Sequence, residues 1–393
     1  MNLCIVTETF WPELNGVANT LHHIVKGLSR MNCKVQLICP AHAERSHDTF
    51  AANFNDNVEY YACKSMPLPG YAEVNVGFPS KKILQRAWRK RRPDAIYVAT
   101  EGPLGWQAVK LANAMGLQVV SGFHTNFQSY SRYYGLKLLE GLVKRYLVSI
   151  HNKTSNTIVP SADQAAMVKG MGVKDVAIMG RGVDTALYSP KQRNIELRKS
   201  WGASDNDTVL LYVGRLAQEK NLDLAIKTYR QLKLIDNSLH LVLVGDGPMM
   251  SQLKQAHPDL VFTGAKQGLD LAQCYASADI FIFPSLTETF GNVVLEAMAS
   301  GLGVVAFDYA AAKQHIDNKL NGIRVAFANE NAFIEATQSL SSNDLLLRKI
   351  RGNAADHALA YSWDAIVRRF IELLGLGSEM DIDGEFVYAD LLA

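Results

Sequence analysis

A strand, loop, helix and strand between Ile280 and Phe307 constrain the fold of this chain more than any other stretch. The segment reads IFIFPSLTETFGNVVLEAMASGLGVVAF. Its apolar ends predict two buried strands, and the part between them, closed by Gly301, has the length of a helix. Thr287, Glu288 and Thr289 come where the first strand ends, so the helical amides that follow lack intrahelical partners. Such a helix start favours an anion.

Two glutamates flank this amide-lined site. Glu296 follows Glu288 after seven intervening residues, which puts one carboxylate in the loop and the other about a turn into the helix. Amides donate to phosphate and carboxylates accept from sugar hydroxyls, so the pattern suits a sugar phosphate. Two solvated surface glutamates are the alternative, because helices often carry such pairs.

Length and composition indicate a soluble globular protein of two or three domains. The chain has 393 residues, of which 48% are apolar and 20% charged. No apolar run reaches the roughly 18 residues that span a bilayer, and MNLCIVTETF enters a strand directly instead of forming a signal peptide. We therefore expect a cytoplasmic protein. The five cysteines form no CxxC or Cys/His pattern, so we expect them to be reduced and structural.

The first half of the chain is basic. Residues 1–190 contain 21 Lys and Arg against 13 Asp and Glu, a net charge of +8 that leaves −6 for the remainder. Much of the excess lies in KKILQRAWRKRRPD, residues 81–94, an amphipathic basic helix that fits an anionic membrane surface through residues 81–92. A solvated helix with an ordinary core-facing side fits equally well. Nucleic acid is disfavoured because no binding module or stacking platform accompanies the charge.

Apolar runs alternate with helix-length segments along the first half, as in a doubly wound parallel sheet. The runs are NLCIVTETF, KVQLICP, AIYVAT and LQVVSGFHTNF. Gly16 starts the first helix and lets backbone approach a diphosphate. Because ligands bind beyond the carboxyl ends of such strands, Gly16, Glu101 and His124 are predicted to share one crevice. The segment SYSRYYGLKLLEGLVKRYL suits either a lipid-linked acceptor or ordinary core packing.

A second alternation begins with TVLLYVGRLAQEKN. The strand 208–213 runs into Gly214 and Arg215, and Lys220 follows at the start of a helix, so two cations beside a glycine turn can clamp a diphosphate. Two further strands end at Gly245 and near Lys266, and these turns are expected to line the same nucleotide-binding side of the sheet. The linker between the two halves is predicted near 186–205.

This series of motifs resembles the retaining glycosyltransferases of the two-Rossmann-domain class (GT-B, family 4-like), which include bacterial mannosyltransferases and glycolipid synthases. The resemblance covers nearly the whole chain and implies an α/β fold with two Rossmann-like doubly wound domains facing each other across a cleft. The implied domains are 1–190 on the acceptor side, 191–362 on the nucleotide-sugar side, a helix 363–375 crossing back to the first domain, and a tail 376–393.

The resemblance also implies roles for individual residues. Glu296 would bind the ribose and Glu288 the hexose, while His124 would meet the sugar near the anomeric carbon. The implied catalytic residues are His124, Glu288, Arg215 and Lys220. The implied donor-binding residues are Gly16, Gly214, Arg215, Lys220, Gly245, Lys266, Glu288, Thr289, Phe290, Gly291, Asn292, Val293 and Glu296. The chain departs from the family pattern at Gly303, where proline is common, and at Ala310, Ala311 and His315, where a glycine pair and a glutamate are common.

Together these features predict a hexosyltransferase that uses UDP-glucose, another UDP-hexose or GDP-mannose, and the resemblance alone implies that transfer retains the anomeric configuration. The predicted acceptor is a membrane lipid such as diacylglycerol, which would place the enzyme peripherally on the inner face of the cell membrane. No metal or cofactor is expected, since HExxH and Cys/His clusters are missing from the sequence. Three alternatives stay open: a soluble sugar or polysaccharide acceptor, a nucleotide-sugar epimerase or hydrolase, and a silent nucleotide-sugar binding protein.

Overall fold

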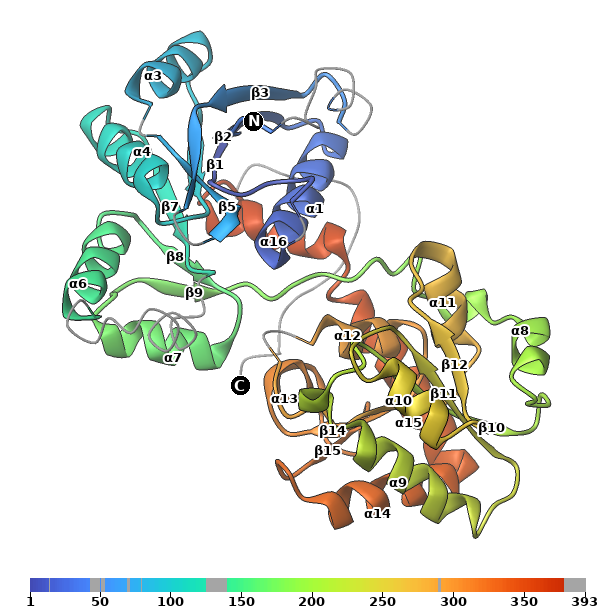
Figure 1. Cartoon of the computed structure of the whole chain (residues 1–393). Helices are drawn as coiled ribbons and strands as arrows, with labels where there is room; N and C mark the ends of the chain where they lie inside the picture. Colours follow the sequence, from blue (N-terminus) through green and yellow to red (C-terminus); the bar gives the residue numbers. More distant parts are fainter. Residues whose placement is uncertain are drawn as a thin grey trace. The chain divides into compact units, whose positions relative to one another are not determined.

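The computed structural model describes residues 1–13, 15–42, 50, 54–68, 71–78, 80–124, 140–288 and 291–377. The chain forms two compact units (Figure 1). The N-terminal unit comprises Met1–Gly180 and the chain from Ile366 onward, and the C-terminal unit comprises Arg181–Ala365. The first boundary thus follows residue 180, ten residues before the predicted boundary after residue 190.

The N-terminal unit contains a seven-stranded parallel sheet in the order β3-β2-β1-β6-β7-β8-β9. Its strands are β1 (Asn2–Val6), β2 (Lys34–Pro40), β3 (Val58–Cys63), β6 (Ala95–Val98), β7 (Val119–Gly122), β8 (Thr157–Val159) and β9 (Val176–Ile178). An antiparallel pair, β4 (Ser65–Leu68) and β5 (Tyr71–Gly77), forms a separate two-stranded sheet in the same unit. The helices are α1 (Gly16–Arg30), α3 (Lys81–Lys90), α4 (Pro103–Ala114), α6 (Glu140–His151), α7 (Ala162–Met171) and α16 (Trp363–Leu373).

The C-terminal unit contains a six-stranded parallel sheet in the order β12-β11-β10-β13-β14-β15. Its strands are β10 (Thr208–Val213), β11 (Leu239–Val244), β12 (Val261–Gly264), β13 (Ile280–Phe283), β14 (Gly303–Phe307) and β15 (Ile323–Val325). The helices are α8 (Ile195–Ser200), α9 (Leu222–Lys233), α10 (Met250–Ala256), α11 (Gly268–Ala276), α12 (Asn292–Ala299), α13 (Ala310–His315), α14 (Glu330–Ser341) and α15 (Asp344–Leu359), with short 3₁₀ turns η1 (Pro190–Gln192) and η2 (Gln218–Lys220). The predicted doubly wound α/β halves are confirmed.

Strand order reverses once in each sheet. The N-terminal sheet reverses between β1 and β6, and the C-terminal sheet between β10 and β13. Loops that leave two such strands diverge to opposite faces, which opens a crevice beyond their carboxyl ends where ligands bind in folds of this kind. In the C-terminal unit these are the loops that carry Arg215 and Glu288.

A buried aspartate ties together the C-terminal sheet and its neighbouring helices. Asp279, just before β13, is 7% exposed. Its carboxylate accepts hydrogen bonds from Arg198 at 2.9 Å, from Arg351 at 3.1 Å and from Arg193 at 3.3 Å. It also accepts from the backbone amide of Val209 in β10. The loss of this carboxylate would leave the buried guanidinium of Arg198 without its carboxylate partner.

The basic helix α3 uses its apolar side for the core of the N-terminal unit. Leu84, Ala87 and Trp88 are buried there, and the Trp88 indole donates to Sγ of Cys4. The exposed residues of the helix are cationic. Helix α3 therefore presents positive charge to a membrane but no free apolar face. All five cysteine side chains are buried. Across the described residues, none of the helices has the length and apolar character needed to cross a membrane.

Candidate functional site

An ion pair joins the two loops at the reversal point of the C-terminal sheet. Nζ of Lys220, in η2 after β10, lies 2.5 Å from Oε1 of Glu288, in the loop after β13. The same ammonium donates to the Thr287 carbonyl at 2.9 Å, and the Ser285 hydroxyl donates to Oε1 of Glu288 at 3.0 Å. The two charged side chains are only 16% and 14% exposed. The structure therefore brings together the predicted diphosphate cation and the predicted sugar carboxylate.

Two glycines allow the strand ends beside this pair to approach each other. A Cβ added to Gly245, whose φ is +140°, would lie 1.9 Å from the carbonyl oxygen of Gly214, whose φ is +157°. Only glycine fits this close backbone approach at the ends of β10 and β11. Arg215 follows directly and is exposed, with no carboxylate partner among the described residues. Lys266, after β12, is exposed as well.

The second predicted glutamate is held by a tyrosine. Glu296 lies in α12 and is partly buried. The hydroxyl of Tyr275, a fully buried residue of α11, donates to its Oε2 at 3.0 Å. Burial raises the pKa of Glu296 to about 7, although the hydrogen bond from Tyr275 acts to lower it. This carboxyl group is therefore close to its titration midpoint at neutral pH.

Helix α12 starts as the sequence predicts, next to the Glu288 loop. Gly291 precedes it with φ +73° and provides no side-chain cap. The amides of Asn292 and Val293, in the first turn, are thus without a capping side chain from that position. The predicted residues Thr289 and Phe290 lie outside the described residues.

The start of α1 in the N-terminal unit is already capped. The Asn15 side chain accepts from the amides of Val17 at 3.1 Å and Ala18 at 2.9 Å. Gly16, between them, is exposed at the carboxyl edge of the sheet. Asn15 therefore already occupies the two amides that follow Gly16, whose backbone the prediction assigns to a diphosphate.

His124 is positioned by residues that sequence reasoning missed. Its Nε2 lies 2.8 Å from the hydroxyl of Tyr97, a fully buried residue of β6. The Tyr97 ring packs edge-on against Phe370 of α16, with ring centroids 4.8 Å apart. A Cβ on Gly122 would lie 2.2 Å from the Tyr97 hydroxyl and 2.6 Å from Nε2 of His124. Gly122 thus leaves the space in which the histidine and the phenol meet.

A buried carboxylate occupies the reversal point of the N-terminal sheet. Glu8 follows β1 and accepts from the amides of Leu104 at 3.0 Å and Gly77 at 3.3 Å, so it caps the start of α4. Burial raises its pKa to about 7. Glu101, which follows β6, lies 3.5 Å from Nε2 of the buried His151. The position of Glu101 after a strand end predicts it as a site residue. The same kind of position gives no sign that Glu8 caps α4.

The predicted residues therefore fall into two groups, one in each unit. Lys220 and Glu288 are in direct contact, and Gly214 and Gly245 adjoin each other, all in the C-terminal unit. Gly16 and His124 belong to the N-terminal unit. Within the described ranges, no group of three or more His, Cys, Asp or Glu side chains is arranged to hold a metal ion.

Comparison with known proteins identifies relatives over most of the chain. The models of Glycosyltransferase Family 4 and of Glycosyl transferases group 1 match residues 14–187 and 207–343. A GDP-mannose-dependent alpha-mannosyltransferase of Mycobacterium tuberculosis is 31% identical, over 82% of this chain and 83% of that protein. An alpha-monoglucosyldiacylglycerol synthase of Streptococcus pneumoniae is 26% identical, over 82% and 74%. The crystal structure of HepE from Anabaena in complex with UDP matches with a TM-score of 0.71 at 19% identity, over 95% and 100%.

Proposed function

The chain belongs to glycosyltransferase family 4 and has the GT-B fold, and from this premise we propose that it is a retaining hexosyltransferase with a membrane-lipid acceptor. The donor is a nucleoside-diphosphate sugar, UDP-glucose or another UDP-hexose or GDP-mannose. The acceptor is a lipid such as diacylglycerol, and the product is an α-glycosidic glycolipid. The enzyme then works in the cytoplasm, peripherally on the inner face of the cell membrane.

The ion pair between Lys220 and Glu288 is the observation that carries this proposal. It lies at the sheet reversal, where a ligand is expected, and it couples the group that neutralises a leaving diphosphate to the group that orients the sugar. As the bond from the anomeric carbon to the diphosphate breaks, negative charge builds on the diphosphate. The ammonium of Lys220 and the exposed guanidinium of Arg215 stabilise that charge.

Glu288 and Glu296 orient the donor in this proposal. Glu288 is fixed by Lys220 and Ser285 and accepts hydrogen bonds from hexose hydroxyls. Glu296, fixed by Tyr275, accepts from the ribose. The acceptor oxygen then takes the face of the anomeric carbon that the diphosphate leaves, and its proton passes to the departing phosphate. None of these steps needs a metal ion.

The names of two relatives support a lipid acceptor and GDP-mannose as one candidate donor. The similar protein of Mycobacterium tuberculosis uses GDP-mannose by its name, and that of Streptococcus pneumoniae is named for a glucosylated diacylglycerol. The net charge of +8 on residues 1–190 also favours an acceptor in an anionic membrane. Among the described residues, no side chain distinguishes a uracil base from a guanine base.

A radiolabel transfer assay tests the proposal. UDP-glucose, UDP-glucuronate, UDP-galactose and GDP-mannose are offered separately with mixed lipid vesicles, and the products are extracted into organic solvent. Label in the lipid phase from one donor, lost in Glu288→Gln, is the expected result. Labelled product that stays in the aqueous phase and forms only with a sugar acceptor would refute the lipid acceptor. Release of free sugar or of an epimer in the absence of an acceptor would refute the transferase activity.

A further inference from the structure

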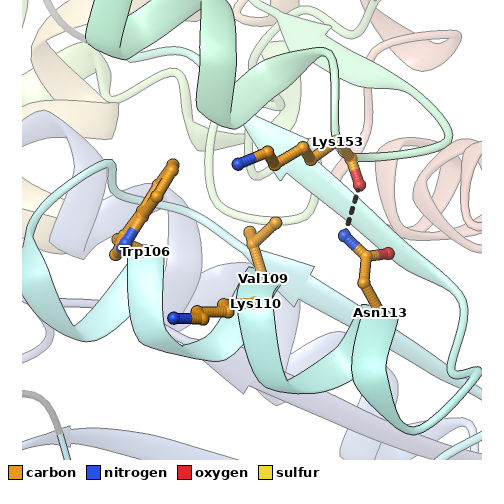
Figure 2. Close-up of a pocket in the computed structure, with 5 residues that line it drawn as sticks. All are labelled: Trp106, Val109, Lys110, Asn113 and Lys153. Carbon is orange, nitrogen blue, oxygen red and sulfur yellow. Dashed lines mark hydrogen bonds between the residues drawn. The ribbon is translucent and has the colours of Figure 1, made fainter.

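A pocket on the N-terminal unit lies between α4 and the residues after α6 (Figure 2). It has a volume of about 250 Å³ and is lined by Trp106, Val109, Lys110, Asn113 and Lys153. Nζ of Lys153 lies 4.4 Å from the centroid of the Trp106 ring, and the Asn113 amide donates to the Lys153 carbonyl at 2.9 Å. Figure 2 shows Lys110 and Lys153 extending on opposite sides of Val109. An aromatic face and two ammonium groups thus border a small hollow.

Exposed apolar side chains continue this pocket along α6. Leu142 is 59% exposed, Val143 44% and Tyr146 37%. They share one side of the helix, because residues three and four positions apart are neighbours on a helix surface. The Tyr146 ring lies 5.5 Å from that of Trp106. Leu142, Val143 and Tyr146 therefore form one surface with the Trp106 pocket, which we call the α4–α6 face.

The charge around this face is positive. Lys110, Lys144, Arg145 and Lys153 are all exposed, and within the part of the chain that the structure describes none of them is paired with a carboxylate. Aliphatic side chains bordered by Trp, Tyr and cations are typical of protein surfaces that enter the headgroup region of a membrane. Helix α3 lacks the apolar part of this combination, since its Leu84, Ala87 and Trp88 are buried.

We propose that the α4–α6 face docks the protein on an anionic membrane, with the Trp106 pocket receiving a lipid phosphate and Leu142 and Val143 entering the acyl boundary. The volume of the Trp106 pocket is below the roughly 300–1,000 Å³ of pockets for drug-sized ligands, which suits a lipid headgroup. This inference rests on the proposed lipid acceptor and specifies how the N-terminal unit reaches it. It moves the membrane contact from residues 81–92 to α4 and α6.

Flotation of the full chain with vesicles tests the docking face. Vesicles of phosphatidylcholine alone are compared with vesicles of phosphatidylcholine and phosphatidylglycerol, at low and high salt. Lys110→Gln/Lys153→Gln should weaken partitioning into the anionic vesicles about 30-fold at low salt, the loss expected for two lysines at such a surface. Leu142→Ala/Val143→Ala should weaken it at both salt concentrations, because apolar insertion is not screened.

The matched control is Lys81→Gln/Lys82→Gln, which removes the same charge from α3 in the same unit. Equal losses in this control and in Lys110→Gln/Lys153→Gln would overturn the proposal in favour of a diffuse charge effect. Wild-type protein that fails to float, or that self-associates through Leu142 and Val143 in sedimentation without vesicles, would also overturn it. Transfer to a detergent-solubilised lipid reports separately on the proposed function, so a protein that transfers without floating would contradict only the docking face.

Discussion

Removal of the Tyr275 hydroxyl is predicted to shift the pH dependence of donor binding. Tyr275→Phe keeps the ring in its packing and deletes the hydrogen bond to Glu296. A hydrogen bond to a charged group contributes about 1.5–3 kcal/mol, and one pKa unit corresponds to about 1.4 kcal/mol. The pKa of Glu296, already about 7 because of burial, should therefore rise by about one to two units in the variant.

The direction of the effect on donor binding follows from the ionisation state of Glu296 that suits the ribose hydroxyls. In the proposed donor site an ionised Glu296 accepts from ribose hydroxyls, so donor affinity should be present above the pKa of Glu296 and should be lost as pH falls through it. At pH 7 about half of the wild-type carboxyls are ionised, against roughly one to ten per cent in Tyr275→Phe. Donor binding at pH 7 should weaken roughly five- to fifty-fold and recover near pH 9.

Calorimetric titration with UDP-glucose and GDP-mannose between about pH 6 and 9 measures this shift. Sugar nucleotides are used because their diphosphate diester does not titrate in this range. Tyr229→Phe is the matched control, since Tyr229 is also buried in the C-terminal unit but lies on α9. Glu296→Gln should bind donor with no dependence on pH in this range. Identical pH profiles for wild type and Tyr275→Phe would refute the positioning of Glu296 by Tyr275.

Three further changes have predicted outcomes. Lys220→Ala should raise the activation free energy of transfer by about 2–4 kcal/mol, measured as kcat/KM, and an unchanged rate would remove Lys220 from the site. Gly122→Ala should slow transfer without abolishing binding of free nucleoside diphosphate, because the new methyl would lie 2.6 Å from Nε2 of His124. Asp279→Asn should lower the free energy of unfolding by about 3–5 kcal/mol in urea. The exposed ion pair between Arg230 and Asp259 is the comparison. Asp259→Asn should cost about 1 kcal/mol or less, and equal losses would contradict the assignment of Asp279 as a buried anchor.

The sequence predicts elements and loop positions well where the signal is local. Buried parallel strands are read as apolar runs, and Lys220 and Glu288 are placed by the ends of such runs. Their direct contact follows from the strand order, which puts β10 beside β13. No short pattern encodes that order, so the ion pair is visible only in the structure.

Residues that act through tertiary contacts escape sequence reasoning. Tyr97 within a strand and Tyr275 within a helix look like core aromatics, and nothing near them in sequence names a partner. The departure of Ala310 from the family pattern has a structural consequence that only the backbone conformation shows. Its φ is +49°, a left-handed conformation that glycine adopts more readily than alanine.

Each unit holds one titratable site residue with a buried phenol, and this shared arrangement has a chemical consequence. Burial raises the pKa of both Tyr97 and Tyr275, so both remain O–H donors throughout the physiological range. The Tyr97 hydroxyl has His124 as its one hydrogen-bond partner among the described residues, and a buried hydroxyl left without an acceptor is costly. When Tyr97 donates to Nε2, a neutral His124 carries its proton on Nδ1. The hydrogen bond from Tyr275 likewise favours the ionised form of Glu296, and it opposes the burial that raises the pKa of this carboxyl group.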